Sequence, residues 1–399
     1  MDFNGISRRV FLKWLALANI FFLVSNNKTS YGQKILRDSA HDSVNEGTLA
    51  RSRVLRIHGS KVIPNANFVS DPYLDSIRDD KLEEMLGEGV KEFTQQKNLK
   101  TAWLDILTNY KKGDKVAIKP NFNFLNHGYK FTITSPQLIN SVVKQLIETV
   151  GISPQEIFLY DLCKKIPNDI VRNRISYPIN YVERMDSKTI VDKIRLRLYY
   201  GLASADLDAE IKMRESIIDK NGSPIKCYIP KVVTQAQHLI NMPLLTNHIF
   251  IANSGSLKNH YGTVRFSNFH SYPGVLHGGV LDKAIVEINS NDHIKNKTRI
   301  IIADGLFGVY DRGDSNEGGK KKPWRTFNND LPRSIFMSKD PVAIDSVMAS
   351  IIIKERKAHK LNILSTEYLR DAMDSRLGIH EISERDIKFT NIQYSTLSL

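Results

Sequence analysis

The chain has 399 residues, 41% hydrophobic and 25% charged, with a formal net charge of +13 at pH 7. This is an ordinary globular composition with enough length for a large core. The two cysteines, Cys163 and Cys227, exclude a four-cysteine iron–sulfur cluster or a cysteine-rich zinc site built by this chain alone. The excess positive charge favours anionic partners, although a basic soluble protein without one is the simpler interpretation, and no specific nucleic-acid partner is expected.

The first 32 residues have the pattern of an export signal. Residues 7–13 (SRRVFLK) resemble the twin-arginine motif around Arg8 and Arg9, and an apolar run follows at 14–24. That run is too short to cross a bilayer core of roughly 30 Å as a helix. We therefore expect a twin-arginine signal peptide at 1–32, recognised by the twin-arginine translocation machinery, and a periplasmic or other extracytoplasmic location. Retention at the membrane by an uncleaved signal is an alternative.

The next segments predict a linker and the first elements of a domain. Residues 33–52 are polar and aperiodic, as in a mobile linker, and residues 53–57 alternate as a short strand. Residues 75–110 have helical periodicity, in which Gly87 and Gly89 weaken the helix and offer a place for it to divide.

A strand–helix–strand unit is predicted next. Residues 115–119 form an apolar strand that stops at a proline, so Lys119 and Asn121 lie where open α/β sheets bind ligands. Ser135 is expected to be the N-cap of the following helix, and residues 157–160 form the next strand. A right-handed crossover should join the two strands.

Residues 166–230 are expected to form an insertion or helical cap, with helices at 188–199 and 207–214 and an edge strand at 225–230. Further strands are predicted at 236–242, at 299–303 ending in Asp304, at 334–337 and at the edge in 388–394. Helices are predicted at 280–288 and after the N-cap Asp340. Asp345 is expected to have an electrostatic role near the first turn of the second helix. The prediction is one α/β domain over 53–399. Its mixed, mostly parallel sheet should include residues 116–119, 157–160, 237–241 and 299–303, with helices on both faces.

Histidines concentrate after the strand at 236–242. Four of the eleven, His248, His260, His270 and His277, lie within residues 241–279. Polar, histidine-rich loops held by a buried strand are common positions for sites, and clustered ionisable groups favour a site over isolated core histidines.

Several short blocks occur in a fixed order: 116–121 (VAIKPN), 134–136 (TSP), 241–243 (NMP) with His248, 256–262 (SLKNHYG), His270, His277, Asp304-Gly305 and 340–345 (DPVAID). Taken together, they resemble the bacterial and archaeal family known as domain of unknown function 362. The resemblance covers about residues 54–357 and implies a fold and a site while leaving the reaction and substrate open. Many members carry a ferredoxin-like iron–sulfur module; this chain does not, so no iron–sulfur cluster is expected.

Three functions fit these residues. In the first, the cofactor is a divalent transition metal, because imidazole and carboxylate suit such ions. Its ligands would be His248, His260, His270 and His277 with Asp304 or Asp161.

In the second, a small phosphate or carboxylate ligand is bound, with His260 and Lys258 as catalytic residues that move a proton near it. Its binding residues would be Lys119, Asn121, Lys258 and Asn259. In the third, a non-catalytic basic envelope protein binds a polyanion or a protein partner. Whether the protein is an enzyme, and its oligomeric state, stay open.

The first two functions share a geometric expectation. Because the carboxyl ends of parallel strands meet at one edge of a sheet, their loops should meet over one crevice. The residues expected to converge there are Lys119, Asn121, Lys258, Asn259, His260 and Asp304, lined or covered by His270 and His277, while His41, His58 and His359 stay outside.

Overall fold

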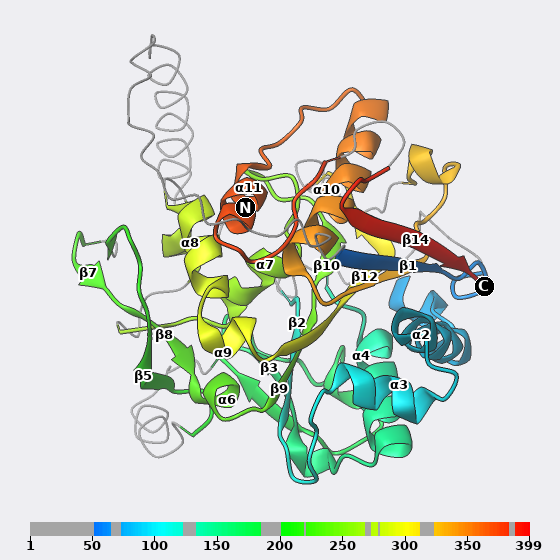
Figure 1. Cartoon of the computed structure of the whole chain (residues 1–399), viewed down its shortest axis with the longest axis horizontal. Helices are drawn as coiled ribbons and strands as arrows, with labels where there is room; N and C mark the ends of the chain where they lie inside the picture. Colours follow the sequence, from blue (N-terminus) through cyan, green and yellow to red (C-terminus); the bar gives the residue numbers. More distant parts are fainter. Residues whose placement is uncertain are drawn as a thin grey trace, which may run out of the picture. The chain divides into compact units, whose positions relative to one another are not determined.

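A large mixed sheet forms the centre of the computed structural model (Figure 1). The structure describes residues 52–64, 73–122, 133–184, 201–218, 221–267, 273–277, 280–311, 323–382 and 388–399. In this part of the chain the sheet has nine strands in the order β14-β1-β13-β12-β9-β2-β3-β4, and β10 pairs with β12 beside this path. The strands are β1 (Ser52–His58), β2 (Val116–Pro120), β3 (Ile157–Asp161), β4 (Asn180–Glu183), β9 (His238–Met242), β10 (Leu244–Thr246), β12 (Thr298–Val309), β13 (Ser334–Ser338) and β14 (Ile392–Ser398).

The four strands predicted to share a sheet are neighbours within it. They occur as β12-β9-β2-β3, and each pair among them is parallel. Only β13 runs antiparallel to its neighbours, β1 and β12. The mixed, mostly parallel sheet is therefore confirmed. Every residue of β2, β3 and β9 is buried, as expected for apolar strands covered on both faces.

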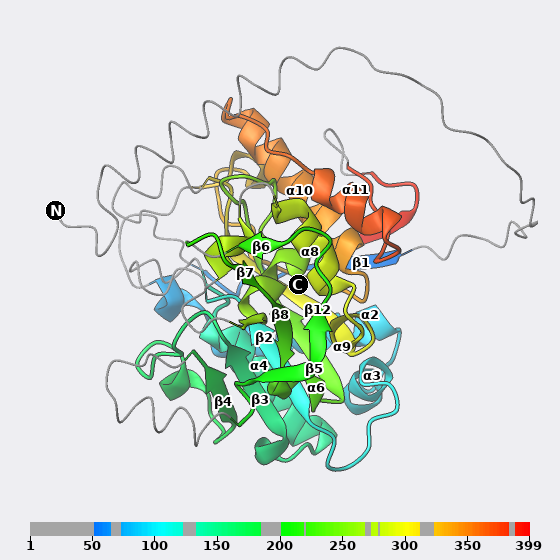
Figure 2. The same cartoon turned by 90° about the vertical axis from the view of Figure 1, so that its left-hand side faces the viewer.

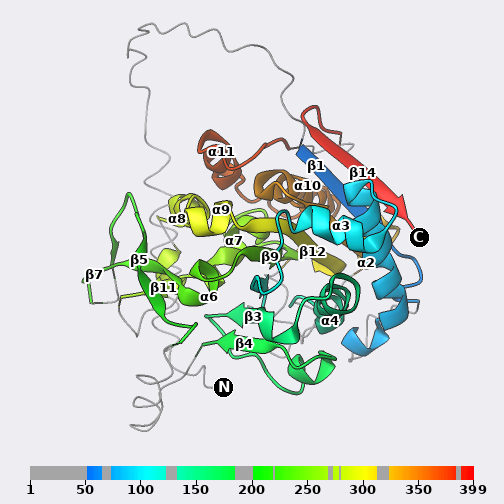
Figure 3. The same ribbon diagram turned by 60° about the horizontal axis from the view of Figure 1, so that its bottom comes forward.

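Helices cover both faces of the sheet. Figures 1 and 3 show α2, α3 and α4 together on one face, with α8, α10 and α11 on the other. Alternate strand residues follow this division: Ile118 and Ile300 pack with the first group, whereas Ala117 and Ile301 pack on the opposite side. The helices are α2 (Asp79–Thr94), α3 (Leu99–Ile106), α4 (Pro136–Lys144) with its π-helical continuation Gln145–Val150, α8 (Leu281–Asn289), α10 (Pro341–Ala358) and α11 (Glu367–Asp374).

The carboxyl ends of β2, β3 and β9 lie at one edge of the sheet. The register pairs Lys119 with Asn241 and Pro120 with Met242. Asp161 ends the neighbouring strand β3. Polar side chains that are far apart in the sequence are thus brought together before any loop is considered.

The region at 166–230 differs from its prediction. Residues 207–214 were expected to be helical, but β5 (Ala205–Ile211) pairs antiparallel with β8 (Cys227–Pro230). Alternation explains the difference, because Ala209 and Ile211 of β5 are buried against the core between more exposed residues. β8 also pairs with β11 (Arg265–Phe266), and β5 and β8 face the viewer in Figure 2. The helix expected at 188–199 lies outside the described residues.

Short elements complete the described chain. They are β6 (Ile217–Ile218), β7 (Pro224–Ile225), α6 (Lys231–Thr234), α7 (Ser256–Asn259), α9 (Asp292–Lys295) and the 3₁₀ turns Tyr73–Ser76, Pro154–Glu156, Arg172–Arg174, His260–Gly262, Pro273–Leu276 and Arg325–Phe327. No helix within the described ranges is both long and apolar enough to cross a membrane. The expected signal peptide, and the linker apart from its last residue, precede these ranges.

The division between α2 and α3 also corrects a prediction. Both glycines lie inside α2, and the chain turns instead at Gln95, which has a left-handed φ of 57°. Asn98 then caps α3 by accepting a hydrogen bond from the Thr101 backbone N–H at 3.1 Å. Gly89 has a packing role, since a Cβ there would lie 2.8 Å from Cγ1 of Ile57 in β1.

Alanine substitutions at the two glycines should have opposite effects on the free energy of unfolding. Gly89→Ala gains about 1 kcal/mol of helix propensity but forces Ile57 aside, so a net loss of about 1–2 kcal/mol is expected. At Gly87 the nearest atom to an added Cβ is 3.5 Å away, so Gly87→Ala should stabilise by up to ~1 kcal/mol. Urea unfolding of both variants measures this, and equal stability would contradict the packing role.

Candidate functional site

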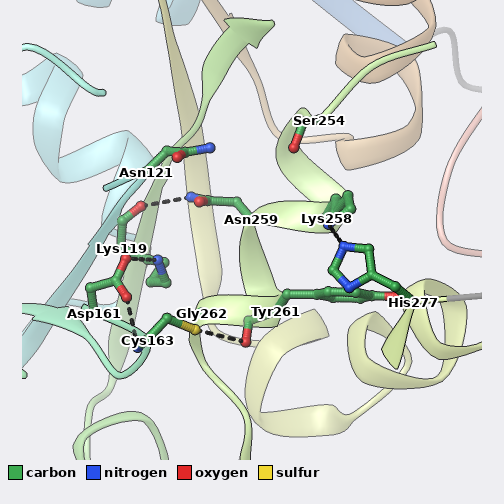
Figure 4. Close-up of a pocket in the computed structure, with 10 residues that line it drawn as sticks. All are labelled: Lys119, Asn121, Asp161, Cys163, Ser254, Lys258, Asn259, Tyr261, Gly262 and His277. Atoms are coloured by element: carbon green, nitrogen blue, oxygen red, sulfur yellow. Dashed lines mark hydrogen bonds and ion pairs between the residues drawn. The ribbon is translucent and has the colours of Figure 1, made fainter. Parts of the chain in front are cut away.

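The edge where β2, β3 and β9 end holds a small cavity, drawn in Figure 4. Its volume is about 70 Å³, several times the ~10–15 Å³ that one water molecule requires. It therefore has room for a few waters or a small polar group. The lining residues are Lys119, Asn121, Asp161, Cys163, Ser254, Lys258, Asn259, Tyr261, Gly262 and His277.

A buried ion pair forms one wall. Lys119 is only 1% exposed, and its Nζ donates to Oδ2 of Asp161 at 3.0 Å and to the Pro120 carbonyl at 2.6 Å. The other carboxylate oxygen of Asp161 accepts the backbone N–H of Cys163 at 2.9 Å. A Cβ on Gly262 would lie 2.7 Å from the Lys119 ammonium, so the glycine leaves the space that this ammonium occupies.

A short helix, α7, forms the opposite wall, and Asp345 of α10 holds its beginning. The buried carboxylate of Asp345 accepts the backbone N–H groups of Ser256 at 2.6 Å and Leu257 at 3.0 Å. Burial raises the pKa of Asp345 to about 7, against the opposing effect of these two hydrogen bonds. The cap fixes the position of the helix that carries Lys258 and Asn259.

Asn259 joins the two walls. Its Nδ2 donates to the Lys119 carbonyl at 3.0 Å and to Oδ1 of Asn241 at 2.8 Å. Asn241 then points its own Nδ2 at Nε2 of His260, 3.2 Å away. The Lys119 carbonyl can only accept, so it fixes the orientation of both amides.

The orientation of the Asn241 amide determines which ring nitrogen of His260 carries the proton. Its Nε2 accepts from Asn241, so its proton is on Nδ1, which donates to Oγ1 of Thr263 at 3.1 Å. Burial and the nearby Lys119 charge lower the pKa of His260 to about 3. His260 is therefore a neutral, buried residue behind the cavity wall, and it is not among the lining residues.

Lys258 and His277 meet at the far end of the cavity in Figure 4. The Nζ of Lys258, which is 5% exposed, donates to Nε2 of His277 at 3.2 Å and lies 4.3 Å from the centroid of the Tyr261 ring. His277 also stacks on His248, with ring centroids 5.3 Å apart. The ammonium is thus held beside an aromatic face and an imidazole.

Five of the residues expected to converge line the cavity: Lys119, Asn121, Lys258, Asn259 and His277. The two others that the structure describes do not. His260 lies behind the wall. Asp304 accepts hydrogen bonds from the Ser135 backbone N–H at 2.7 Å, from the Ser135 hydroxyl at 2.6 Å and from the Leu306 backbone N–H at 2.9 Å. Asp304 therefore holds the start of α4, and Ser135 occupies the N-cap without capping through its own hydroxyl.

The other histidines have separate surroundings or fall outside the description. His270 and His41 lie outside the described residues. His58 contacts the Pro332 carbonyl at 3.1 Å and His359 contacts Glu355 at 2.8 Å, and neither lines the cavity. His248 is not a lining residue, and its ring stacks on that of His277.

Sequence reasoning missed several lining residues, namely Cys163, Ser254, Tyr261 and Gly262, and named Asp161 only as a metal ligand. The signal for Asp161 was present, since it ends a strand beside the strand that carries Lys119. Cys163 is a free thiol whose pKa is raised to about 12 by burial and by the Asp161 carboxylate. Cys227 is also free and lies buried in β8.

The proposed metal ligands do not form a recognisable centre in the part of the chain that the structure covers. Within that part, no group of three or more His, Cys, Asp or Glu side chains is placed to hold a metal ion. His260 bonds to Asn241 and Thr263, whereas Asp304 bonds to Ser135 and Leu306.

Comparison with known families assigns the chain to one of them. The model of the family described as domain of unknown function 362 matches residues 116–350, more than half of the chain, and the protein belongs to this family. The match runs from β2 into α10 and includes every lining residue named above. A comparison with curated proteins found no match.

Removing one partner of the buried ion pair should strongly lower the free energy of unfolding. Asp161→Asn leaves the Lys119 ammonium without its carboxylate, which costs about 3–5 kcal/mol in buried pairs. The matched control is Glu84→Gln, which breaks the more exposed Lys81–Glu84 pair of 2.7 Å and should cost at most ~1 kcal/mol. Denaturant unfolding compares the two, and similar small losses would show that Lys119 does not depend on Asp161.

Proposed function

We propose that the cavity binds a small anionic ligand through a carboxylate or phosphate group. The observation that carries this proposal is the charge of the lining: two lysines, each at most 5% exposed, and one carboxylate, Asp161. That carboxylate is engaged by Lys119. An anion beside Lys258 would gain from a site with little water, where charges interact more strongly than in bulk solvent.

The metal function is the weaker alternative. Its described ligands hydrogen-bond to different partners, whereas the residues proposed for anion binding line a single cavity. His270 lies outside the described residues, and a metal bound by it would need further ligands close to it. The test of the proposal therefore also measures metal content.

A proton-transfer role, if the ligand is turned over, belongs to His277 rather than to His260. Both ring nitrogens of His260 are held by neighbours, and its low pKa keeps it neutral. His277 lines the cavity beside Lys258, where a general acid or base can reach a bound ligand. Lys258 would hold the anionic group.

Ligand binding should stabilise the native protein and should depend on Lys258. Inorganic phosphate or acetate at a hundred times its Kd would raise the free energy of unfolding by about 2.7 kcal/mol, measured as a shift in Tm. Lys258→Met should weaken binding at least tenfold. Lys100→Met, which removes the same charge from an exposed position in α3, should leave it unchanged.

Calorimetric titration and metal analysis of protein without a histidine tag complete the test. If Lys258→Met and Lys100→Met weaken ligand binding equally, the binding depends on general surface charge rather than on the cavity. A stoichiometric transition metal that is lost on His260→Ala or His270→Ala would favour the metal function. If the protein binds none of these ligands and contains no metal, the result would favour a non-catalytic envelope protein.

We also propose that the protein is exported by the twin-arginine pathway, on the strength of residues 7–13 and the apolar run that follows. Replacing Arg8 and Arg9 together by lysine should abolish export, because the charge is retained while the arginine pair that the receptor reads is lost. Cell fractionation measures the result. Wild-type amounts of the double variant in the periplasm would refute the proposal.

A further inference from the structure

The amide of Asn259 presents a defined hydrogen-bonding group to the cavity. Both protons of its Nδ2 are directed to protein acceptors, the Lys119 carbonyl and Oδ1 of Asn241. Only its carbonyl oxygen, Oδ1, is left for another partner, and no residue in the described ranges donates to it. Asn259 is 6% exposed and lines the cavity, so this oxygen is an acceptor open to whatever occupies the cavity, water included.

Ser254 adds a second polar group to the same wall. It is 3% exposed, and its backbone N–H donates to the Thr246 carbonyl at 2.7 Å. Its hydroxyl has no hydrogen-bond partner among the described residues, and Figure 4 shows it directed towards Asn259 and Lys258. The lining therefore combines an ammonium, an acceptor oxygen and a hydroxyl within about 70 Å³.

We propose that the ligand carries a hydroxyl group next to its anionic group. The anion lies against Lys258, and the ligand hydroxyl donates to Oδ1 of Asn259 with the Ser254 hydroxyl beside it. This assignment rests on the proposed anion-binding function and narrows it to hydroxylated acids. A ligand without a donor would displace water from this acceptor and leave it unpaired, which opposes binding.

A hydroxyl fits the site better than an amine. The ammonium form of an amine would bring a further positive charge beside Lys258, while the one lining carboxylate, Asp161, is already engaged by Lys119. A neutral hydroxyl donates to Asn259 without that repulsion and can accept from Ser254 at the same time. The small volume limits the enclosed part of the ligand to this head group.

The test compares four small probes with the wild-type protein by calorimetric titration: acetate, fluoroacetate, glycolate and glycine. Fluoroacetate has nearly the size of glycolate but no donor, so it separates hydrogen bonding from volume. Glycolate should bind roughly tenfold or more tightly than acetate and fluoroacetate, since each acceptor left unpaired carries a penalty of this order. Glycine should bind more weakly than glycolate.

Equal affinities for glycolate and fluoroacetate would overturn the inference while leaving the anion site intact. No binding of any probe or of inorganic phosphate would overturn the anion site as well, so the two failures are distinguishable. Asn259→Ala should abolish the advantage of glycolate, whereas Asn168→Ala, at an exposed position, should retain it. If Asn259→Ala does not fold, the wild-type probe series decides alone.

Discussion

The buried ion pair between Lys119 and Asp161 is the constraint around which the site is built. An ammonium that is 1% exposed must be surrounded by acceptors, and it has the Asp161 carboxylate and the Pro120 carbonyl. These acceptors come from the ends of two adjacent parallel strands, so the pair also fixes where β2 and β3 end relative to each other. Gly262 then has to lack a side chain, because the ammonium occupies the space that a Cβ would need.

Hydrogen bonds between amide groups, rather than further charges, connect this pair to the neighbouring side chains and hold them in place. The Lys119 carbonyl orients Asn259, Asn259 orients Asn241, and Asn241 determines which nitrogen of His260 carries the proton. Asp345 holds the other end of α7 through two backbone N–H groups. A ligand would thus meet groups already in place, and binding would lose less free energy to ordering of side chains.

The strands and the edge that carries the site could be predicted from the sequence, because buried parallel strands read as continuous apolar runs that end at polar residues. The same rule misplaced Asp304. Asp304-Gly305 looks like a strand end, yet β12 continues to Val309, because β10 and β13 pair with it on both sides. Asp304 consequently lies within a strand and faces the start of α4. His260 was expected to lie with the converging residues and is not among the lining residues, because it bonds to Asn241. Asn241 is 19 residues away, and no local pattern reveals that contact.

The contrast between His260 and His277 shows why clustering in sequence is a poor guide to chemistry. Both lie in the same histidine-rich stretch, but hydrogen bonds to Asn241 and Thr263 use both ring nitrogens of His260. Burial and the nearby Lys119 charge keep its ring neutral. His277 instead contacts an ammonium at the cavity, with its ring against other aromatic rings. In the proposed function, the histidine within reach of the ligand is therefore His277, and tertiary packing rather than the motif decides this.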